Sequence, residues 1–412
     1  DYGDDWESIG EGIDGFVHTI EEDPVDPNLL FAGSELGLWV SFDRGDSWHK
    51  WTHGFPTVPV RSLVVHPRDH DLAIGTFGRA IYILDDLRPL RALARSGGAP
   101  RELTLFDPPA AYLQRIAAMN GYHFSGDAMF KGETRMRGAM LSYWVPEGLS
   151  GPEGGEGGAV AVGPEETDAV EDGGQEGGPE AEIIVLNQTG AEIRRFRGPA
   201  EPGLNRTGWD LRADLPGADE DTAGGGGGPF GSPRGPEVVP GSYTVRVELG
   251  GESSEARLEL LPDPRTEIAM VDRIAKYEAS MEAAELNQRL TRAQDRVREV
   301  EEALEQLLST LEGMEGEGAE ALRTAARRLQ ETVEEDVDFE PATSQRRGLF
   351  ALQSSWDAPT TRELMAMERM ENALGGIEAD VNALIAGPVT DFRRQVEGTD
   401  LVLFPTFDPV GR

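Results

Sequence analysis

Histidine serves both metal binding and acid–base chemistry, and this chain carries six histidines. All of them lie in the first 123 residues, at His18, His49, His53, His66, His70 and His123. His66 and His70 have the i, i+4 spacing that places two ligands on one face of a helix. Pro67 between them disfavours a helix, so this spacing does not bring the two rings together. We therefore expect neither a metal site nor a bound cofactor.

Carboxylates are the second candidates, because glycoside hydrolysis needs two of them facing one ligand. Asp14, Glu35 and Asp69 lie in predicted loops of the N-terminal third, where each is expected to serve as a turn residue. The chain has no G-x-S-x-G and no H-E-x-x-H motif. The glycine run Gly224–Gly228 lacks the lysine and helix entry of a phosphate-binding loop. No catalytic residue can be assigned on this basis.

The stretch from Ser41 to Trp48 reads S-F-D-R-G-D-S-W, which is the pattern of a tight turn. Asp43 can accept hydrogen bonds from backbone N–H groups within the turn. Gly45 can take a positive φ without steric cost, and Trp48 can bury its ring as the next strand begins. These residues fit S-x-D-x-G-x-S/T-W, the Asp-box of bacterial neuraminidase-type (BNR) repeats. The motif predicts a structural fastener and carries no catalytic group.

The same motif recurs at the start of the chain, which opens D-Y-G-D-D-W. Asp1, Gly3 and Trp6 stand 42 positions before Asp43, Gly45 and Trp48. A period in the forties with a turn signature and tryptophan is typical of a four-stranded β-propeller blade. Because residue 1 falls inside a motif, we expect the chain to be the C-terminal portion of a longer protein.

The elements that must position these motifs are strands. We expect four strands in the first repeat, at residues 16–20, 29–33, 38–42 and 48–51. The second repeat predicts strands at residues 60–67, 72–76 and 80–84 and then decays, since Leu87 replaces the glycine of the motif that follows Asp85. A blade without its fourth strand leaves an open edge, which we expect the missing N-terminal blades to close.

The segment Gly75–Leu90, G-T-F-G-R-A-I-Y-I-L-D-D-L-R-P-L, resembles the end of the propeller in large bacterial proteins with sortilin-like BNR repeats, often labelled "glycosyl hydrolase". Phe77 and Tyr82 depart from the histidine and tryptophan that are usual in that pattern. In such proteins the propeller is followed by a small β-domain and a helical tail. The resemblance therefore implies that residues 1–93 are the last propeller blades.

Residues 94–265 are predicted to form a linker and an Ig-like β-sandwich. Strands are expected at residues 139–145, 183–186, 193–196, 207–211, 243–249 and 256–261. The pieces Gly203–Arg212 and Val239–Val247 resemble the Ig-like domain of flagellar hook-capping (FlgD-like) proteins, with Trp209 in the core. Two Gly-, Glu- and Pro-rich inserts, 147–180 and 217–237, are expected to be disordered.

Residues 266–400 show helical periodicity. An a/d seam predicts a helix from Ile268 to Glu312, about 67 Å long. The seam consists of Leu290, Ala293, Val297, Val300, Leu304, Leu307 and Leu311.

A second helix is expected at Leu322–Val333. After a loop through Pro341, a further turn or two of helix is expected. A last long helix is expected to begin at the Thr360–Glu363 capping box and to end at Gly387-Pro388. A three- or four-helix bundle is favoured over a coiled-coil dimer, and the apolar tail 401–412 is expected to dock on another surface.

The net charge of the chain limits the classes of partner that it can bind. The net charge of −37, from 75 acidic and 38 basic residues, disfavours nucleic acid and anionic lipid. Zero cysteine excludes disulfides, and no stretch is apolar enough to span a membrane.

The fold class expected is multidomain, with β-propeller blades, an Ig-like sandwich and a helical bundle. The first function hypothesis is non-catalytic binding of a glycan or polypeptide by a secreted or periplasmic propeller protein. The alternatives are a glycoside hydrolase whose carboxylates lie on absent blades, and a scaffold module.

Overall fold

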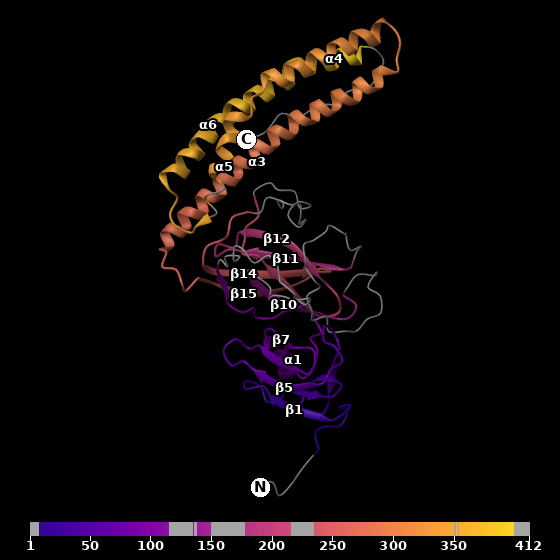
Figure 1. The fold of residues 1–412 in the computed structure, drawn as a ribbon, viewed down its shortest axis with the longest axis vertical. Coiled ribbons are helices and arrows are strands. Elements are labelled where there is room, and N and C mark those ends of the chain that lie inside the picture. Colours follow the sequence, from indigo (N-terminus) through magenta and orange to yellow (C-terminus); the bar gives the residue numbers. More distant parts are fainter. Residues whose placement is uncertain are drawn as a thin grey trace. The chain divides into compact units, whose positions relative to one another are not determined.

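The computed structural model describes residues 8–114, 135, 138–149, 178–215, 235–349, 352 and 354–398. The two predicted disordered inserts fall almost entirely outside these residues. The chain is a multi-unit protein that combines antiparallel β-sheets with several helices (Figure 1). It divides into two compact units, one up to Thr266 and one from Glu267 onward, and the second also takes in the short pieces 215–217 and 235–237.

The first sheet is a four-stranded antiparallel meander whose strands follow one another in chain order. They are β1 (Val17–Glu22), β2 (Leu30–Ser34), β3 (Gly37–Ser41) and β4 (His49–Trp51). The second sheet repeats the first three strands about 43 residues later and lacks the fourth. It consists of β5 (Val60–Val65), β6 (Leu72–Thr76) and β7 (Ile81–Leu84). The seven strands are those that the repeat predicts.

The two sheets pack face to face around a shared apolar core. Phe31, Leu38 and Val40 of the first sheet are buried against Leu72 and Ile74 of the second. Close approach is needed at Gly33, where an added Cβ would lie 2.5 Å from Val60 Cγ1. The repeat therefore stacks one sheet on the next.

Where the repeat would place a fourth strand, residues 91–93, the chain forms helix α1 (Arg88–Ser96), which the sequence analysis did not predict. Pro89 stands in its first turn and Gly97 ends it at φ 69°. The helix buries Leu90 and Leu93 in the core shared by the two sheets. The edge of β7 that a fourth strand would cover makes no strand pairing among the described residues.

Two further sheets follow in the same unit. One has the order β13-β10-β8 and the other the order β12-β11-β14-β15-β9, with β9 parallel to β15. Their strands are β8 (Thr104–Leu105), β9 (Ala111–Leu113), β10 (Ala139–Val145), β11 (Glu180–Leu186), β12 (Glu192–Pro199), β13 (Gly203–Trp209), β14 (Gly241–Leu249) and β15 (Glu252–Pro262). Trp209 is buried as predicted and packs edge-on against Tyr243. The strand expected at 207–211 lies instead at 203–209, because Leu211 has a left-handed φ of 62°.

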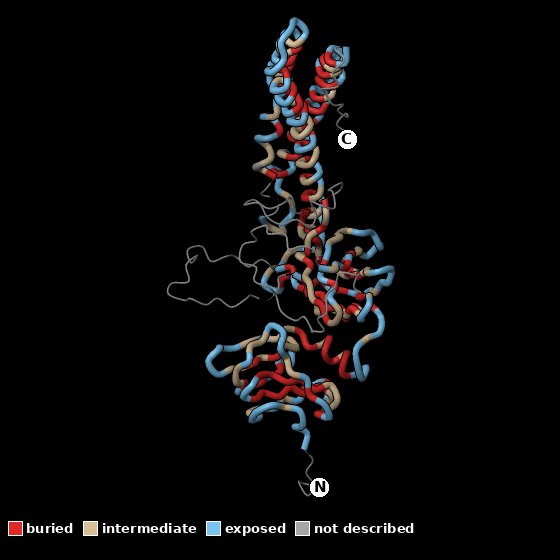
Figure 2. The backbone as a smooth tube through the Cα atoms, turned by 90° about the vertical axis from the view of Figure 1, so that its right-hand side faces the viewer, coloured by how far each residue is buried: buried red, intermediate tan, exposed pale blue. Residues whose placement is uncertain are grey.

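The second unit is helical, and α3 runs alongside α4 and α6 (Figure 1). Its elements are α3 (Met270–Glu312), α4 (Glu317–Asp336), α5 (Glu340–Leu349), α6 (Thr361–Leu384), the π-helical turn η2 (Ile385–Val389) and α7 (Thr390–Glu397). The predicted seam of α3 is buried within this chain, where it packs with residues of the later helices (Figure 2). The Thr360–Glu363 capping box forms as predicted.

Two helical predictions were wrong. Pro341 stands in the first turn of α5 rather than in a loop, a position where its missing N–H costs no helical hydrogen bond. Gly387-Pro388 does not end the last long helix. The chain widens into η2 around Pro388 and continues as α7, and the hydroxyl of Thr390 donates to the carbonyl oxygen of Ile385 at 2.7 Å.

Candidate functional site

The Asp-box turn uses its polar groups internally. Ser41 Oγ accepts from the Gly45 amide at 2.8 Å and donates to Asp43 Oδ1 at 2.7 Å. Asp43 also accepts from the amide and the hydroxyl of Ser47. Burial by itself raises the pKa of the Asp43 carboxyl, but the hydrogen bonds from Ser47 and Ser41 outweigh it and hold that pKa below its ordinary value. Gly45 has a φ of 95°, which its place in the turn requires.

Trp48 fastens this turn to the preceding chain. Its ring is buried with Leu30, Ala32 and Trp39, and its Nε1–H donates to the carbonyl oxygen of Ile9 at 2.6 Å. These hydrogen bonds give the Ser41, Asp43 and Trp48 side chains a structural role in holding the turn. The first copy of the motif, Asp1, Gly3 and Trp6, lies outside the described residues.

Two arginines of helix α1 form ion pairs with aspartates of the turn that joins β1 to β2. This turn lies at the same end of the sheet as the Asp-box turn. Arg91 binds Asp23 through two nitrogens, at 2.9 Å from Nε and 2.7 Å from Nη2. Only 2% of Asp23 and 3% of Arg91 are exposed. Arg95 binds Asp26 at 2.8 Å. In a meander the β1–β2 and β3–β4 turns share an end, so the Asp-box end is held by paired charges.

The opposite end of the two sheets is different in character. It comprises the start of β1, the β2–β3 turn and the β6–β7 turn, and it carries Phe16 and Phe77 with 76% and 70% of their surface exposed. Arg61 at the start of β5 lies with its guanidinium 5.8 Å from the ring centroid of Phe77. We call Phe16, His18, Glu35, Arg61 and Phe77 the open-end surface.

Backbone hydrogen bonds hold the open-end surface in place. The amide of Glu35 donates to the carbonyl oxygen of Phe16 at 3.0 Å, and the amide of Phe77 donates to that of Pro59 at 2.8 Å. His18 and Arg61 occupy equivalent positions of the two repeats, 43 residues apart, and their Nδ1 and Nη1 atoms lie 3.3 Å apart. The rigid strands thus bring an arginine, a histidine and two exposed rings to one end of the stack.

His18 has one ring nitrogen without a partner. Because Arg61 can only donate, Nδ1 of His18 is the acceptor in this contact. The Nε2 atom of His18 is buried and has no hydrogen-bond partner among the described residues. Because this atom is shielded from solvent, the groups of the open-end surface that a ligand can reach are the two exposed rings and Arg61.

One of the three candidate carboxylates is separated from the other two. Glu35 and Asp14 lie toward the open end, whereas Asp69 is in the β5–β6 turn at the Asp-box end and pairs with Arg68 at 2.7 Å. A two-carboxylate hydrolytic site cannot be assembled from Asp69 and either of the other two.

His66 and His70 do not form a metal pair either. His66 Nδ1 accepts from the Asp69 amide at 3.1 Å, and His70 has a left-handed φ of 63°. Burial lowers the pKa of His70, and the charges of Arg91 and Arg88 lower it further. Within the described ranges, no three His, Asp or Glu side chains are arranged to hold a metal ion.

A third charged cluster, which sequence reasoning missed, joins β7 to β13. Arg206 donates to the carbonyl oxygens of Asp85 and Asp86 at 2.8 and 3.3 Å. Arg135 lies 3.1 Å from Asp71, which accepts from the Asp86 amide. Burial raises the pKa of Asp85. These contacts fix the sheets of the first unit to each other, and they involve backbone acceptors that a sequence pattern does not show.

The residues Arg61 and Phe77 were also missed as site residues. The available signal was the alignment of His18 with Arg61 at the repeat period, whereas Phe77 stands out in the sequence only as a departure from a pattern.

Searches of protein-family models, curated proteins and solved structures gave no match to this chain. Among the described residues, no helix is long and apolar enough to cross a membrane.

Proposed function

We propose that this chain is a non-catalytic binding protein that recognises a glycan or a polypeptide through the open-end surface. The observation that carries the proposal is that two exposed rings, Phe16 and Phe77, lie at the same end of the stacked sheets and that the Arg61 guanidinium lies beside the ring of Phe77. Aromatic rings stack on sugar faces and on apolar side chains, and arginine adds a charge-assisted donor. Binding sites of this kind combine apolar contact area with a few fixed polar groups.

The proposal places this surface on the last two blades of a BNR-repeat β-propeller. The repeat supports this assignment because apolar positions that are buried in the first repeat are exposed in the second. Leu38 and Val40 are buried between the sheets, whereas their equivalents in the second repeat, Ile81 and Ile83, are 72% and 55% exposed. A further sheet packed on that face would bury them in the same way. The preceding blades of a longer protein are the proposed source of that sheet.

The other parts complete the proposed architecture. The sheets formed by β8–β15 are proposed to be an FlgD-like Ig sandwich, supported by the buried Trp209 and by the Tyr243 hydroxyl that donates to the Val239 carbonyl oxygen. The helices from Met270 onward are proposed to be a bundle, supported by the burial of the α3 seam. A secreted or periplasmic location is proposed from the resemblance to envelope proteins alone.

The two other function hypotheses receive less support. A glycoside hydrolase needs two carboxylates facing one ligand, which this hypothesis places on blades outside this chain, so no described residue supports it. A scaffold role predicts no ligand at the open end, where exposed aromatic rings would then have no use. Exposed aromatic residues in a cluster are more often a binding site.

The test is a glycan and peptide array probed with the chain, followed by titration of each hit with variants. Phe77→Ala and Arg61→Ala are expected to weaken binding at least tenfold, the loss of about 1.4 kcal/mol or more that is common for an aromatic or arginine anchor. Tyr112→Ala, at an exposed aromatic residue of β9, is the matched control and should bind as the parent does. Equal weakening by all three variants, or silence on both arrays, would contradict the proposal.

A further inference from the structure

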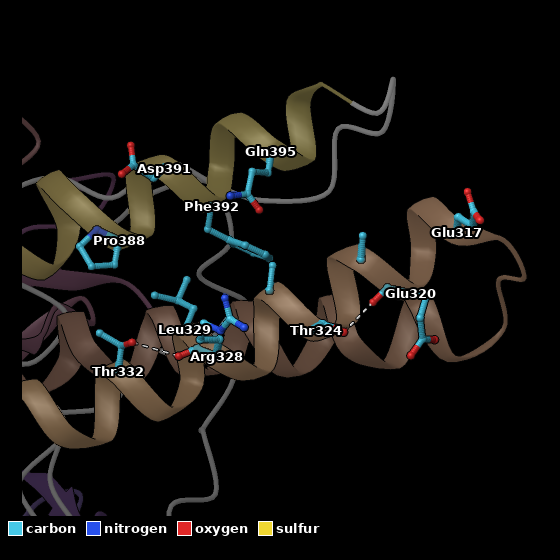
Figure 3. A pocket seen from close by; sticks show the side chains of 12 residues that line it. Glu317, Glu320, Thr324, Arg328, Leu329, Thr332, Pro388, Asp391, Phe392 and Gln395 are labelled. Atoms are coloured by element: carbon cyan, nitrogen blue, oxygen red, sulfur yellow. Dashed lines mark hydrogen bonds between the residues drawn. The ribbon is translucent and has the colours of Figure 1, made fainter.

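A groove of 590 Å³ lies between α4 and the continuous segment of η2 and α7. Figure 3 shows Phe392 extending from α7 toward α4 and Leu329 extending from α4 toward η2. With Pro388 and Ala325 these side chains make the floor apolar. Glu317 and Glu320 of α4 are among the acidic residues of its margin.

The groove depends on the π-helical turn. Pro388 has no N–H to donate, and the widened turn from Ile385 to Val389 accommodates it without ending the helix. The Thr390 hydroxyl adds a second hydrogen bond to the Ile385 carbonyl oxygen, which also accepts from the backbone N–H of Thr390. Such π-helical turns are rare, and they are frequently found at functional sites. Here the turn brings the proline ring to the groove and directs α7 along α4.

We propose that residues 401–410 of this same chain occupy the groove. They lie outside the described residues, and their sequence is L-V-L-F-P-T-F-D-P-V. Six of the ten are large apolar residues, which lose free energy when they leave water for an apolar floor. Pro405 and Pro409 disfavour a helix and favour an extended peptide, the form that fits between two helices.

The connection is short enough to allow this. Gln395 lines the groove and α7 ends at Glu397, so only residues 398–400 separate the helix from Leu401. Three extended residues span about 10 Å. The groove follows α4 from Glu317 to Thr332, about 22 Å at 1.5 Å per residue. About seven extended residues cover that length.

Charge favours this occupant over an acidic peptide. The margin carries Glu317, Glu320 and Asp391 against Arg328. An acidic ligand would be repelled by this margin, as by a chain of net charge −37. The segment 401–410 has a single carboxylate, Asp408, and relies on apolar contacts. Its docking is therefore expected to depend little on salt concentration.

The absence of cysteine from the chain allows a direct test by disulfide trapping. One cysteine replaces Thr324 in the groove and a second replaces Leu403, with neighbouring positions 401–407 scanned because the register is unknown. The control pairs the same tail cysteines with Gln330→Cys, which lies about 120° round α4 from Thr324 and does not line the groove. Rates are normalised to the reaction of each α4 cysteine with a small thiol reagent.

We expect an intramolecular disulfide to form at least tenfold faster with Thr324→Cys than with Gln330→Cys, seen as a mobility shift of the monomer. Equal rates would overturn the proposal. Disulfides formed only between chains would also overturn it, because the occupant would then be the tail of a second copy.

A second measurement uses native side chains. Ending the chain at Asp400 should speed amide hydrogen exchange at residues 321–332 and 389–396, and a synthetic peptide of residues 401–410 should restore the protection. Exchange at β11, in the other unit, is the internal control and should not change. Unchanged exchange in the groove on truncation would overturn the proposal even if the trapping variants failed to fold.

Discussion

The buried ion pair between Asp23 and Arg91 gives the sharpest test of how the Asp-box end is held. Asp23→Ala leaves a guanidinium that is only 3% exposed without its counter-charge. Removing one partner of a buried pair costs about 3–5 kcal/mol. Asp23 Oδ1 also accepts from the amides of Val25 and Asp26 at 2.9 and 2.8 Å, so Asp23→Ala removes these two hydrogen bonds as well. The three interactions share one carboxylate and their costs are not additive, so the total destabilisation is expected to stay within about 3–5 kcal/mol.

Variants separate the charge from the turn. Asp23→Asn keeps an acceptor for the two amides and is expected to cost less than Asp23→Ala. Arg91→Met leaves Asp23 with both backbone donors, so it too should cost less. The double variant Asp23→Asn, Arg91→Met should be less destabilised than the sum of the two single changes, because each single change leaves one unpaired group. Asp69→Ala removes the exposed pair with Arg68 and serves as the control, with no change expected.

The assay is urea unfolding followed by tryptophan fluorescence, with hydrogen exchange of β1 and β2 amides to assign the transition to the sheets. The reasoning would be refuted if Asp23→Ala unfolded at the parent's urea concentration and exchanged no faster. A double variant as unstable as the sum of its parts would refute the coupling between the two residues.

Three further outcomes are expected. Gly45→Ala should cost about 1–3 kcal/mol, because φ is 95° and the added Cβ would lie 3.1 Å from Ile9 Cβ, whereas Gly10→Ala, with open space around it, should be neutral in the same urea assay. Burial by itself raises the pKa of Glu363, but the hydrogen bonds from Thr360 and Lys276 outweigh it and hold this pKa below the ordinary value of about 4.5. The ionised carboxylate therefore stabilises the folded helical unit above pH 4.5, and this contribution is lost as the pH falls through the lower pKa of the folded state. Glu363→Gln should therefore flatten the acid side of the helical unit's stability profile, and an unchanged profile between pH 5 and 2 would contradict this. Light scattering should find the chain monomeric if the α3 seam is satisfied internally, and a dimer that dissociates on Leu304→Asp would show the coiled-coil alternative instead.

Much of the fold could be predicted because its signals are local and repeated. The strands β1–β7 alternate with turn residues and recur at a fixed period, and α3 carries a regular seam. Helix α1 had equally local signals in Pro89 and Gly97, but the repeat predicted a strand at that place and the helix was missed. The shift of β13 depends on the backbone of Leu211, which its side chain gives no reason to expect.

The candidate site was harder to predict, because exposure depends on what covers a residue. Phe77 and Phe31 are the same residue type in neighbouring repeats, yet one is 70% exposed and the other fully buried. The difference comes from the face and the end of the sheet that each occupies. Sequence could place Glu35 in a turn, but it could not show that this turn shares an end with Phe16 and Arg61.

The two ends of the stacked sheets differ in how their polar and apolar groups are used, and this difference supports a binding role. At the Asp-box end, the carboxylate of Asp43 accepts from a backbone amide and that of Asp23 forms an ion pair with an arginine of α1. At the open end, two large rings stay in water and the Nε2 atom of His18 stays unpaired. Each of these features costs free energy in the unbound protein. A ligand that covers the two rings would remove their apolar surface from water and so gain free energy on binding, whereas a purely structural role gives the exposed rings no such function.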